Sequence, residues 1–376
     1  MKRIIQNSLI LNLILLSTST ISPWWFDLLP VQELIKQNPA IQYQKCYDQF
    51  PFTYQSFPIS INHAGHPSHG FFHETFILTI PNGTVQAYGL VLANNKFIKE
   101  LVWKGWEHNL AHVQKFANHQ IMRIPGRVAV IGQAAAHNYW HWTSEILCRL
   151  ALLELQGIEY DYLYVPYHLP YMKETLELWG IDPKKIIAAR DNLCIQADHI
   201  IVPSLVSNVS FGGVMFSCYA QHHLIEYVKN KLLTAALQRN PSIRLSPRVF
   251  VSRKDAAQRR ITNEDEVFAL LQTQGFERYE LGKLSVIDQI LLFYNANIIL
   301  APQGTCLANS IFCTPKTKII ELFQGLNDAT FWYLSQDLHL NYTPIQTTTF
   351  SHDYMKAWAG NTVMPLSVIQ KIIKTL

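Results

Sequence analysis

The amino-acid sequence predicts an α/β protein built from two Rossmann-like units, and three observations support this fold class. Segments typical of buried strands alternate with amphipathic helical segments over residues 248–323. A similar alternation begins at residue 127. The chain has 376 residues, 49% of them hydrophobic, which is enough to build two substantial cores.

These units and their flanking segments divide the chain into four expected regions. The first is an N-terminal helical segment, and the second is a Rossmann-like domain with a β-rich lead-in. The third is another Rossmann-like domain, and the fourth is a closing amphipathic helix. In chain order the regions are residues 1–45, 46–240, 241–350 and 351–376.

The N-terminal segment combines Lys2 and Arg3 with a short apolar stretch at residues 9–16. This pattern resembles the start of a secretory signal, but Asn7 and Asn12 interrupt it and no small-x-small cleavage site follows. The stretch is also too short and too polar to span a bilayer. We therefore expect a helix that packs on the surface or touches a membrane.

The cysteines indicate the cellular compartment of the protein, and the net charge indicates which partners it binds. The six cysteines form no CxxC pair and no zinc-ligand spacing, so a reducing, cytoplasmic compartment is the simpler interpretation, with one or two disulfides left open. The net charge of only +4 gives no indication of nucleic-acid binding, which depends on clustered Lys and Arg.

Strand-like segments dominate the lead-in. Residues 76–80 and 85–92 predict strands, and Pro81-Asn82-Gly83 between them predicts a β-hairpin. Four histidines occupy the preceding loop: His63, His66, His69 and His73. Their spacing fits no tight ligand set, so a polar loop is favoured over a metal site.

The first Rossmann-like unit opens with a strand at residues 127–132 and a helix from Trp142 to near Gly157. His141 and Glu145 are four residues apart, so they share one face near the start of this helix. A His–carboxylate pair suits general-base chemistry, because the carboxylate orients the ring and raises its basicity. The alternative is a buried histidine satisfied by its own helix, with Trp140 and Trp142 in the core.

The rest of this unit has weaker signals. We expect strands at residues 162–165, 186–187 and 199–202, helices near 172–178 and before 237, and a linker at 240–247. No Gly-x-Gly-x-x-Gly sequence is present, which argues against a standard dinucleotide site.

The second unit begins with a strand at residues 248–252. Asn263 followed by Glu266 predicts a capping box, and Ser285 followed by Asp288 predicts a second helix start. Strands at residues 297–300 and 318–323 then enclose a short helix at 305–312. The order of elements is strand, helix, strand, helix, strand, loop, helix, strand.

The loop at residues 301–309, hereafter the Gly304 loop, joins a buried strand to a helix. The first N–H groups of such a helix lack internal partners and attract anions, and Gly304 would let the backbone approach a phosphate or a sugar. Basic residues follow the first strand of the unit at the same sheet edge: Arg253, Lys254, Arg259 and Arg260. The alternatives are an ordinary βα turn and a solvated basic turn.

Two blocks of this sequence resemble glycosyltransferase family 61. The first is Asn138-Tyr139-x-His141-Trp142-x-x-Glu145-x-x-x-Arg149-Leu150. The second contains Ser252-Arg253, the Arg259-Arg260 pair, Asn263-Glu264, the Gly304 loop and the strand Ile320-Glu321-Leu322-Phe323. The resemblance implies a GT-B-like fold, in which two Rossmann-like domains face each other across a cleft. It also implies an inverting enzyme that uses a nucleotide sugar, usually linked to UDP, and a glycan or polysaccharide acceptor such as a capsular polysaccharide.

The resemblance also implies roles for individual residues. Glu145 and His141 are the candidate catalytic residues, and the sequence does not separate which of the two is the base. The candidate substrate-binding residues are Asn138, Trp142, Arg253, Lys254, Arg259, Gln303, Gly304, Thr305, Asn309 and Glu321. Because the chain has no Asp-x-Asp, we expect no metal and no cofactor, with Arg253, Lys254 and the helix start receiving the diphosphate.

One departure from the family pattern is chemically important. The family's loop usually reads Pro-His-Gly-Ala-Gly-Leu-x-Asn, whereas here Gln303 replaces the histidine, Thr305 the alanine and Cys306 the second glycine. Glutamine can donate and accept hydrogen bonds but cannot carry a proton. A second hypothesis is therefore a non-catalytic protein that binds a nucleotide sugar or a glycan. A third is a metal hydrolase built on the histidine clusters.

Overall fold

The computed structural model describes residues 28–58, 68–94, 96–103, 121–211, 214–217, 220–323, 328–347 and 360–376. The predicted N-terminal helix, His63 and His66 lie outside these residues. No helix in the described ranges has both the length and the apolar composition to cross a bilayer. The cysteines that the structure describes, five of the six, are free thiols.

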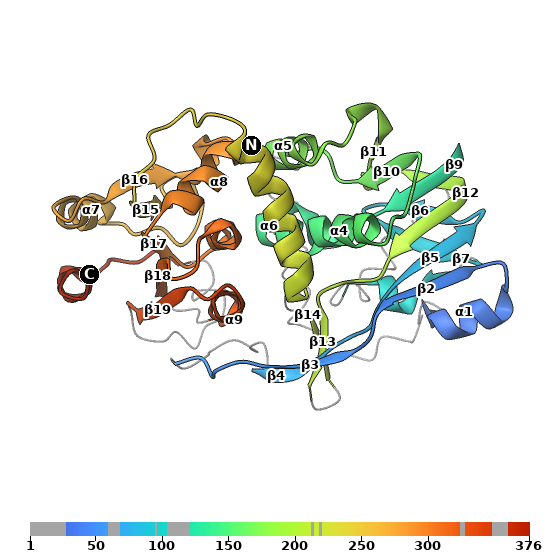
Figure 1. Cartoon of the computed structure of the whole chain (residues 1–376), viewed down its shortest axis with the longest axis horizontal. Coiled ribbons are helices and arrows are strands. Elements are labelled where there is room, and N and C mark those ends of the chain that lie inside the picture. Colours follow the sequence, from blue (N-terminus) through green and yellow to red (C-terminus); the bar gives the residue numbers. More distant parts are fainter. Residues whose placement is uncertain are drawn as a thin grey trace.

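The chain folds into an α/β protein with three β-sheets (Figure 1). A ten-stranded mixed sheet occupies the N-terminal half, and a five-stranded parallel sheet occupies the C-terminal half. A small four-stranded sheet runs along the lower side of the molecule as Figure 1 is drawn. The α/β class predicted from the alternation of segments is therefore confirmed.

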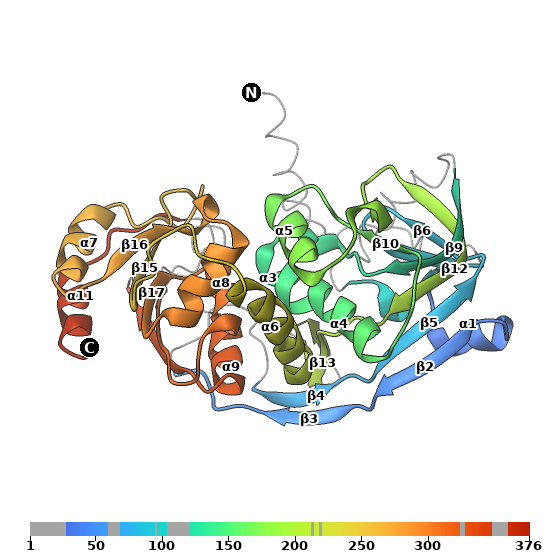
Figure 2. The same cartoon turned by 45° about the horizontal axis from the view of Figure 1, so that its top comes forward.

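The parallel part of the ten-stranded sheet has the order β12-β9-β10-β11. Its strands are β9 (Met122–Val130), β10 (Tyr162–Val165), β11 (Ile186–Ala188) and β12 (Cys194–Pro203). Two helices of this half, α4 (Leu147–Leu155) and α5 (Pro170–Trp179), lie between this sheet and the C-terminal half (Figure 2). Successive side chains of β10 point to opposite faces of the sheet. Leu163 and Val165 therefore join the core under these helices, whereas Tyr164 faces the other side.

The remaining strands of this sheet come from the β-rich lead-in. They are β1 (Leu28–Leu29), β2 (Gln42–Tyr47), β5 (Thr75–Pro81), β6 (Thr84–Gln86), β7 (Leu90–Ala93) and β8 (Lys96–Ile98). Helix α1 (Val31–Gln37) buries Val31 and Leu34 in the core on the far face of the sheet. The short 3₁₀ turn η2 (Lys99–Leu101) closes the lead-in.

The predicted hairpin at Asn82-Gly83 is wrong. Strands β5 and β6 do not pair with each other; both run antiparallel to β12, one after the other along the same edge. Asn82 has a φ of 52° and its N–H donates to the carbonyl of Asp198 at 2.9 Å, so the chain bends there and continues in the same direction. The real hairpin joins β6 to β7, with positive φ at Ala87 and Gly89.

The five-stranded sheet has the order β16-β15-β17-β18-β19, and all its pairs are parallel. Its strands are β15 (Arg248–Ser252), β16 (Glu277–Glu280), β17 (Ile298–Pro302), β18 (Lys318–Phe323) and β19 (Asn341–Gln346). In chain order this is the doubly wound arrangement 2-1-3-4-5. The strand order reverses between β15 and β17, so a crevice for ligands is expected at the carboxyl ends of these two strands.

Helices cover both faces of the five-stranded sheet. One face packs against α7 (Glu264–Gln272) and α11 (Leu366–Ile373), and the other against α8 (Val286–Asn295), the 3₁₀ helix η8 (Thr305–Phe312) and α9 (Thr330–Asp337). Ser285 caps α8 as predicted, because its side chain accepts from the Asp288 N–H. The predicted capping box of α7 is wrong: the Asn263 side chain bonds the backbone of Met364 instead.

One hydrophobic core runs through both halves. It contains Leu150 of α4, Ile290 of α8 and Ile311 of η8, all of them buried. Helix α6 (His222–Leu237) passes between these elements, and its apolar residues, such as Leu224 and Leu232, belong to the same core. Figures 1 and 2 show α6 between the two larger sheets.

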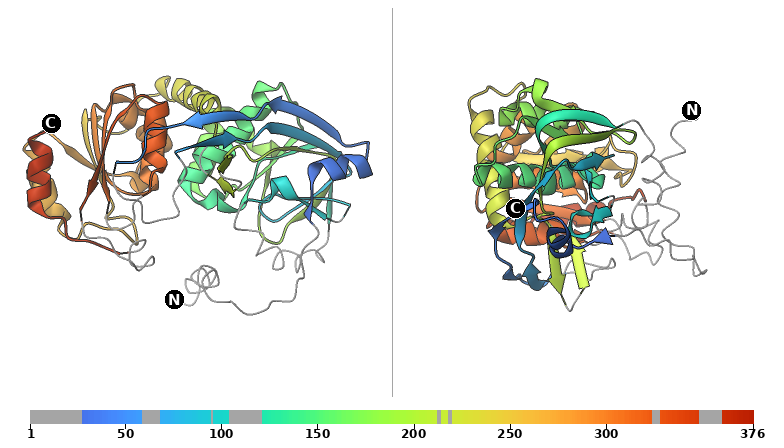
Figure 3. Two further views of the ribbon diagram at one scale, coloured as in Figure 1. Left: turned by 90° about the horizontal axis from the view of Figure 1, so that it is seen from below. Right: turned by 90° about the vertical axis from the view of Figure 1, so that its right-hand side faces the viewer.

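The four-stranded sheet forms an arm between the halves. It contains β3 (Phe50–Thr53), β4 (His69–Phe72), β13 (Asn208–Phe211) and β14 (Val214–Ser217). After β3 the chain reaches α9, where the Tyr54 hydroxyl donates to Asp337 Oδ2 at 3.0 Å and the rings of Tyr54 and Tyr333 stack at 5.1 Å. Figure 3 shows β3 crossing from the N-terminal half to the C-terminal half.

This contact predicts a pH-dependent contribution to stability. Burial raises the pKa of Asp337 to about 6, although Tyr54 and the nearby His222 and His339 lower it. Between about pH 4 and about pH 6 the folded chain holds a proton that the unfolded chain has lost, so this residue's contribution to stability falls as pH rises through that window. In Asp337→Asn this loss of stability should be absent. Between pH 4 and pH 7, the free energy of unfolding of the variant, measured in urea, should therefore change by about 2 kcal/mol in its favour relative to the unmodified protein.

The matched control is Asp48→Asn, since the side chain of Asp48 is 80% exposed and pairs with the exposed Lys45. The control should follow the pH profile of the unmodified protein. If Asp337→Asn follows it as well, the Asp337 carboxyl does not titrate in this window.

Candidate functional site

The helix that carries His141 and Glu145 is irregular. It begins as α3 (Tyr139–His141), widens into the π turn η5 (Trp142–Ile146) and continues as α4. Asn138 caps it by accepting from the Trp140 N–H at 2.9 Å. Within the π turn, the hydroxyl of Ser144 donates to the Trp140 carbonyl at 2.7 Å. Such single π turns are frequent at functional sites, because they change the direction in which side chains leave the helix.

Glu145 is the centre of a buried hydrogen-bonded cluster. Its side chain is 1% exposed, and its Oε1 lies 3.0 Å from Nδ1 of His141. Its Oε2 accepts from the side-chain amide of Gln133, which follows the carboxyl end of β9. Both oxygens of the carboxylate are therefore engaged. The ring of His141 is 23% exposed, and its edge meets Trp103 with 5.4 Å between ring centroids.

The electrostatics of the pair favour a charged histidine. Burial lowers the pKa of His141, but the charge of Glu145 and its hydrogen bond outweigh burial, so the pKa is raised overall. A donor at Nδ1 leaves Nε2 as the ring position that exchanges protons with a ligand. The arrangement can therefore move a proton at His141 while Glu145 fixes the tautomer and stabilises the imidazolium.

Arg149 anchors this cluster to the sheet. Its guanidinium is buried and donates to the carbonyls of Ile131 at 2.9 Å, Gly132 at 2.8 Å and Pro203 at 2.7 Å. Burial lowers its pKa to about 9, while Glu145 raises it. These bonds fix the loop that carries Gln133, so the position of Glu145 depends on the same residue.

A second cluster surrounds the Gly304 loop. The guanidinium of Arg253 covers Gly304, since a Cβ at position 304 would lie 2.2 Å from Nη1 of Arg253. Arg253 also donates to the carbonyl of Gln258 through Nε at 3.3 Å and Nη2 at 3.2 Å. Arg259 donates to Oε1 of Gln303 at 2.6 Å. Two guanidinium groups thus meet at the switch point between β15 and β17.

The charges in this cluster are strongly positive for a partly buried site. Burial and the charge of Arg253 together lower the pKa of Arg259 to about 10, against the opposite effect of Glu321. Burial also raises the pKa of Cys306 to about 11, so its thiol stays protonated at neutral pH. The positive charge of the two arginines makes an anionic ligand favourable here.

Glu321 lies beneath the same loop, opposite Ala301 in the β17–β18 ladder. It is completely buried and accepts a hydrogen bond from Tyr342 through Oε2. Burial raises its pKa well above the usual value, which favours the neutral carboxyl. Its Oε1 has no hydrogen-bond partner among the described residues. Glu321 is therefore not a strand-end carboxylate facing water.

The two clusters are joined by direct contacts between the halves of the chain. The hydroxyl of Tyr139 donates to Oδ1 of Asn309 at 2.9 Å, and Asn309 in turn donates to Gln289 Oε1 at 2.9 Å. The rings of Trp140 and Phe331 meet edge to face at 5.2 Å. The helix of His141 and the helix that follows Gly304 therefore pack together.

The structure does not bring every predicted site residue to this place. Trp142 is completely buried and donates to Thr175 in the core. The ammonium of Lys254 pairs with Asp265 at 2.6 Å on the outer surface. Asn138 acts as a helix cap, and Asn309 is buried in the contact between the halves. Thr305 opens η8 at the loop itself.

Several residues of the two clusters were not predicted from the sequence: Gln133, Trp103, Tyr342 and Glu264. Glu264 was given no site role, although it belongs to the second block. It is buried and accepts from the Ser252 hydroxyl at 2.7 Å, which fixes the end of β15. Gln133 follows a predicted buried strand, and that position was a usable signal. Trp103 and Tyr342 reach the site through tertiary contacts that leave no local pattern.

An α/β protein with polar clusters at the carboxyl ends of parallel strands in two sheets belongs to the broad class of ligand-binding α/β folds. The family model for glycosyltransferase 61 matches residues 139–320, just under half of the chain. Both blocks fall in this range, except for Asn138 at one end and Glu321, Leu322 and Phe323 at the other. This match supports the assignment of the chain to glycosyltransferase family 61, and with it a glycosyltransferase activity. No curated protein matches the chain.

The histidines that the structure describes form no metal site, and His63 and His66 of the lead-in loop lie outside the described residues. No group of three or more His, Cys, Asp or Glu side chains in the described ranges is arranged to hold a metal ion. His69 is the first residue of β4, and His73 comes directly after this strand. Both were predicted to lie in a loop, and in the structure they mark the two ends of β4.

Proposed function

We propose that this protein is an inverting glycosyltransferase that transfers a sugar from a nucleotide sugar, UDP-linked as is usual in the family, to a glycan or polysaccharide acceptor without a resident metal. One observation carries the proposal. A histidine oriented by a buried glutamate and a pair of arginines over a glycine loop come from different halves of the chain, and Tyr139 and Asn309 join the helices that carry them.

A GT-B-like arrangement is part of this proposal. The carboxyl end of β9 leads to the helix of His141, and the carboxyl end of β17 leads to the Gly304 loop. Because α3 and η8 contact each other, ligands bound at these two edges would meet. The N-terminal half would then hold the acceptor, and the C-terminal half the nucleotide sugar.

His141 is the base in this scheme, and Glu145 is its positioning residue. Both oxygens of Glu145 are engaged and its side chain is buried, so it is poorly placed to reach an acceptor hydroxyl. His141 is partly exposed, and its Nδ1 is held by Glu145. Its Nε2 can therefore accept the hydroxyl proton as the acceptor oxygen attacks the anomeric carbon.

The departing nucleotide diphosphate would be stabilised by Arg253, Arg259 and the first N–H groups of η8. These donors are in place before the reaction, so they stabilise the charge that develops on the leaving oxygen without reorganisation. Each such donor is worth roughly 2–4 kcal/mol of barrier, by analogy with the deletion of oxyanion-hole donors. Glu321, as a buried and neutral carboxyl, would bind a hydroxyl of the donor.

Gln303 can replace the usual histidine in a binding role. Its Oε1 accepts from Arg259, which orients the amide and leaves the Nε2 hydrogens to donate to a phosphate oxygen. A role in phosphate binding is therefore compatible with catalysis, whereas a role in proton transfer is not. The second candidate function, binding of a nucleotide sugar without turnover, rests on this substitution.

A donor screen tests the proposal. The unmodified chain would be heated with UDP-, GDP-, ADP- and CMP-sugars, each with and without EDTA. We expect one nucleotide to raise the melting temperature by several degrees, because a ligand at 100 times its Kd stabilises by about 2.7 kcal/mol. EDTA should not change this shift.

Turnover separates the two candidate functions. Slow hydrolysis of the bound donor, seen as release of free nucleotide, would support the transferase. Binding without release, including in the presence of acceptor glycans, would support the non-catalytic protein. A stabilisation lost with EDTA would contradict the metal-free route.

A further inference from the structure

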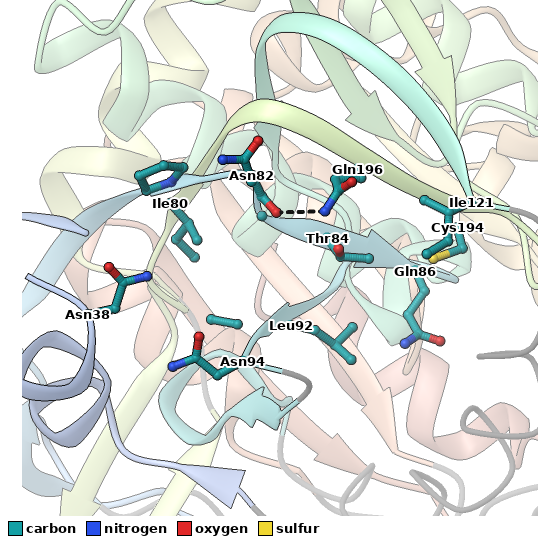
Figure 4. Close-up of a pocket in the computed structure, with 13 residues that line it drawn as sticks. Asn38, Ile80, Asn82, Thr84, Gln86, Leu92, Asn94, Ile121, Cys194 and Gln196 are labelled. Atoms are coloured by element: carbon teal, nitrogen blue, oxygen red, sulfur yellow. Dashed lines mark hydrogen bonds between the residues drawn. The ribbon is translucent and has the colours of Figure 1, made fainter. Parts of the chain in front are cut away.

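The N-terminal half contains a hollow that does not coincide with either cluster (Figure 4). Its volume is about 460 Å³, and strands β5, β6, β7 and β12 form its floor and walls. Six polar residues line it: Asn38, Asn82, Thr84, Gln86, Asn94 and Gln196. We call this site the amide hollow.

The amide hollow is one face of a three-stranded region of the sheet. Thr84 pairs with Leu92 of β7 on one side and with Gln196 of β12 on the other. Residues directly opposite each other in antiparallel strands share a face, so these three form one row across the hollow. The alternate residues, such as Val85 and Ile195, point the other way and are buried in the core.

The chemistry of the lining is polar and uncharged. None of the lining residues is Asp, Glu, Lys, Arg or His, and five of them carry a side-chain amide. An amide offers both a donor and an acceptor, as a sugar hydroxyl does, so the two groups pair well. Leu92 and Ile80 add apolar surface for the C–H face of a sugar ring. An uncharged lining gives no compensation for a phosphate or a carboxylate.

Gln86 gives an independent indication of a ligand. It lines the hollow and is only 3% exposed, yet its Oε1 has no hydrogen-bond partner in the described part of the chain. Gln196, by contrast, donates to the Asn82 carbonyl at 3.1 Å (Figure 4). Buried acceptors normally find a partner, so a donor from a bound molecule is expected at Gln86.

The amide hollow is connected to the His141 cluster by the β6–β7 hairpin. The hairpin turn packs so closely on the next loop that a Cβ at Gly89 would lie 2.2 Å from the Gly132 carbonyl oxygen. Gly132 precedes Gln133, the partner of Glu145. From Thr84 to Gly89 the chain covers five residues, roughly 16 Å if extended. A short oligosaccharide can span this length.

We infer that the amide hollow binds an uncharged stretch of the acceptor glycan, several sugars away from the hydroxyl that reacts. The inference rests on the proposed function, because only a glycan acceptor would extend from His141 into this site. A subsite at the amide hollow would favour long acceptors. A long acceptor would occupy both the amide hollow and the site beside His141, and a monosaccharide would occupy only the site beside His141.

Direct binding tests the inference without any turnover. The probes are hexasaccharides of the neutral glucan, xylan and chitin types, each with its monosaccharide, titrated into the full chain by calorimetry. We expect at least one hexasaccharide to bind, and Gln86→Leu, which keeps the size of the side chain, to weaken it at least tenfold. Thr84→Val, at a half-buried position, should weaken it several-fold. The thermal unfolding of both variants verifies that they fold.

The matched control is Gln370→Leu, the same change on the exposed side of α11. It should leave hexasaccharide binding unchanged. Binding of no hexasaccharide, or equal binding by the folded Gln86 and Thr84 variants, overturns the inference. Donor-dependent nucleotide release is measured in parallel. If release persists while hexasaccharide binding fails, only the subsite is wrong; if release is absent as well, the proposed function fails on its own measurement.

Discussion

Glu145→Gln lowers the kcat of sugar transfer about 1000-fold, within the range usual for loss of acid–base catalysis. The amide still fits between Gln133 and His141, but it no longer stabilises the imidazolium that forms when His141 takes the acceptor proton. His141→Ala has an effect of similar size. Both are measured as nucleotide release with saturating donor and acceptor, and circular dichroism verifies the fold.

The pH profile distinguishes the base from its positioning residue. If His141 is the base, the rate rises with pH as His141 loses its proton, and Glu145 keeps the pKa of that step raised. Glu145→Gln then moves this rise to lower pH, besides lowering the plateau. If the rate of Glu145→Gln rises at the same pH as that of the unmodified protein, the assignment of His141 as the base is contradicted. The control is Glu177→Gln, an exposed position on α5, which should retain both rate and profile.

Arg259→Leu lowers kcat/KM for the nucleotide sugar by a factor of about 100 or more, as expected for the loss of one preorganised donor at a developing charge. Arg259 is held at the Gly304 loop by its bond to Gln303, and the adjacent Arg253 makes the site positive enough to attract a diphosphate. Arg259→Lys should recover only part of the loss, because an ammonium cannot donate in the planar fork geometry of a guanidinium.

Donor affinity and turnover, measured on the same samples, show where the loss occurs. We expect most of it in kcat, since the leaving diphosphate carries more charge at the bridging oxygen than the intact donor does. Arg239→Leu is the matched control, because Arg239 is exposed beyond the end of α6. Equal kinetics for Arg259→Leu and Arg239→Leu would remove the arginine pair from the site.

Sequence patterns correctly predicted the features that depend on residues close together in the chain. The contact between His141 and Glu145 follows from a spacing of four residues, and the place of the Gly304 loop follows from a buried strand that ends in glycine. The cap at Ser285 follows from side-chain chemistry within one turn. In each of these cases the partners are close in sequence.

The predictions failed where a distant segment offered a competing partner. Asn82-Gly83 is a strong hairpin signal, but β12 supplies a continuous edge to both flanking strands, so the chain bends instead of reversing. Asn263 bonds Met364, about a hundred residues away, in place of its own helix. Tyr342 reaches Glu321 only because β18 and β19 are neighbours in the sheet. None of these partners has a signature in the local sequence.

The apolar interior shared by the two halves also bears on how the molecule comes apart. Because Leu150, Leu232, Ile290 and Ile311 lie in the same core, separating the halves would expose buried side chains of α4, α6 and α8 to water. Each half keeps a second core on the other face of its sheet, but the shared core is lost when the halves separate, so melting is expected as one cooperative event. A fragment cut at the linker before β15 would expose this apolar surface to solvent and would tend to aggregate.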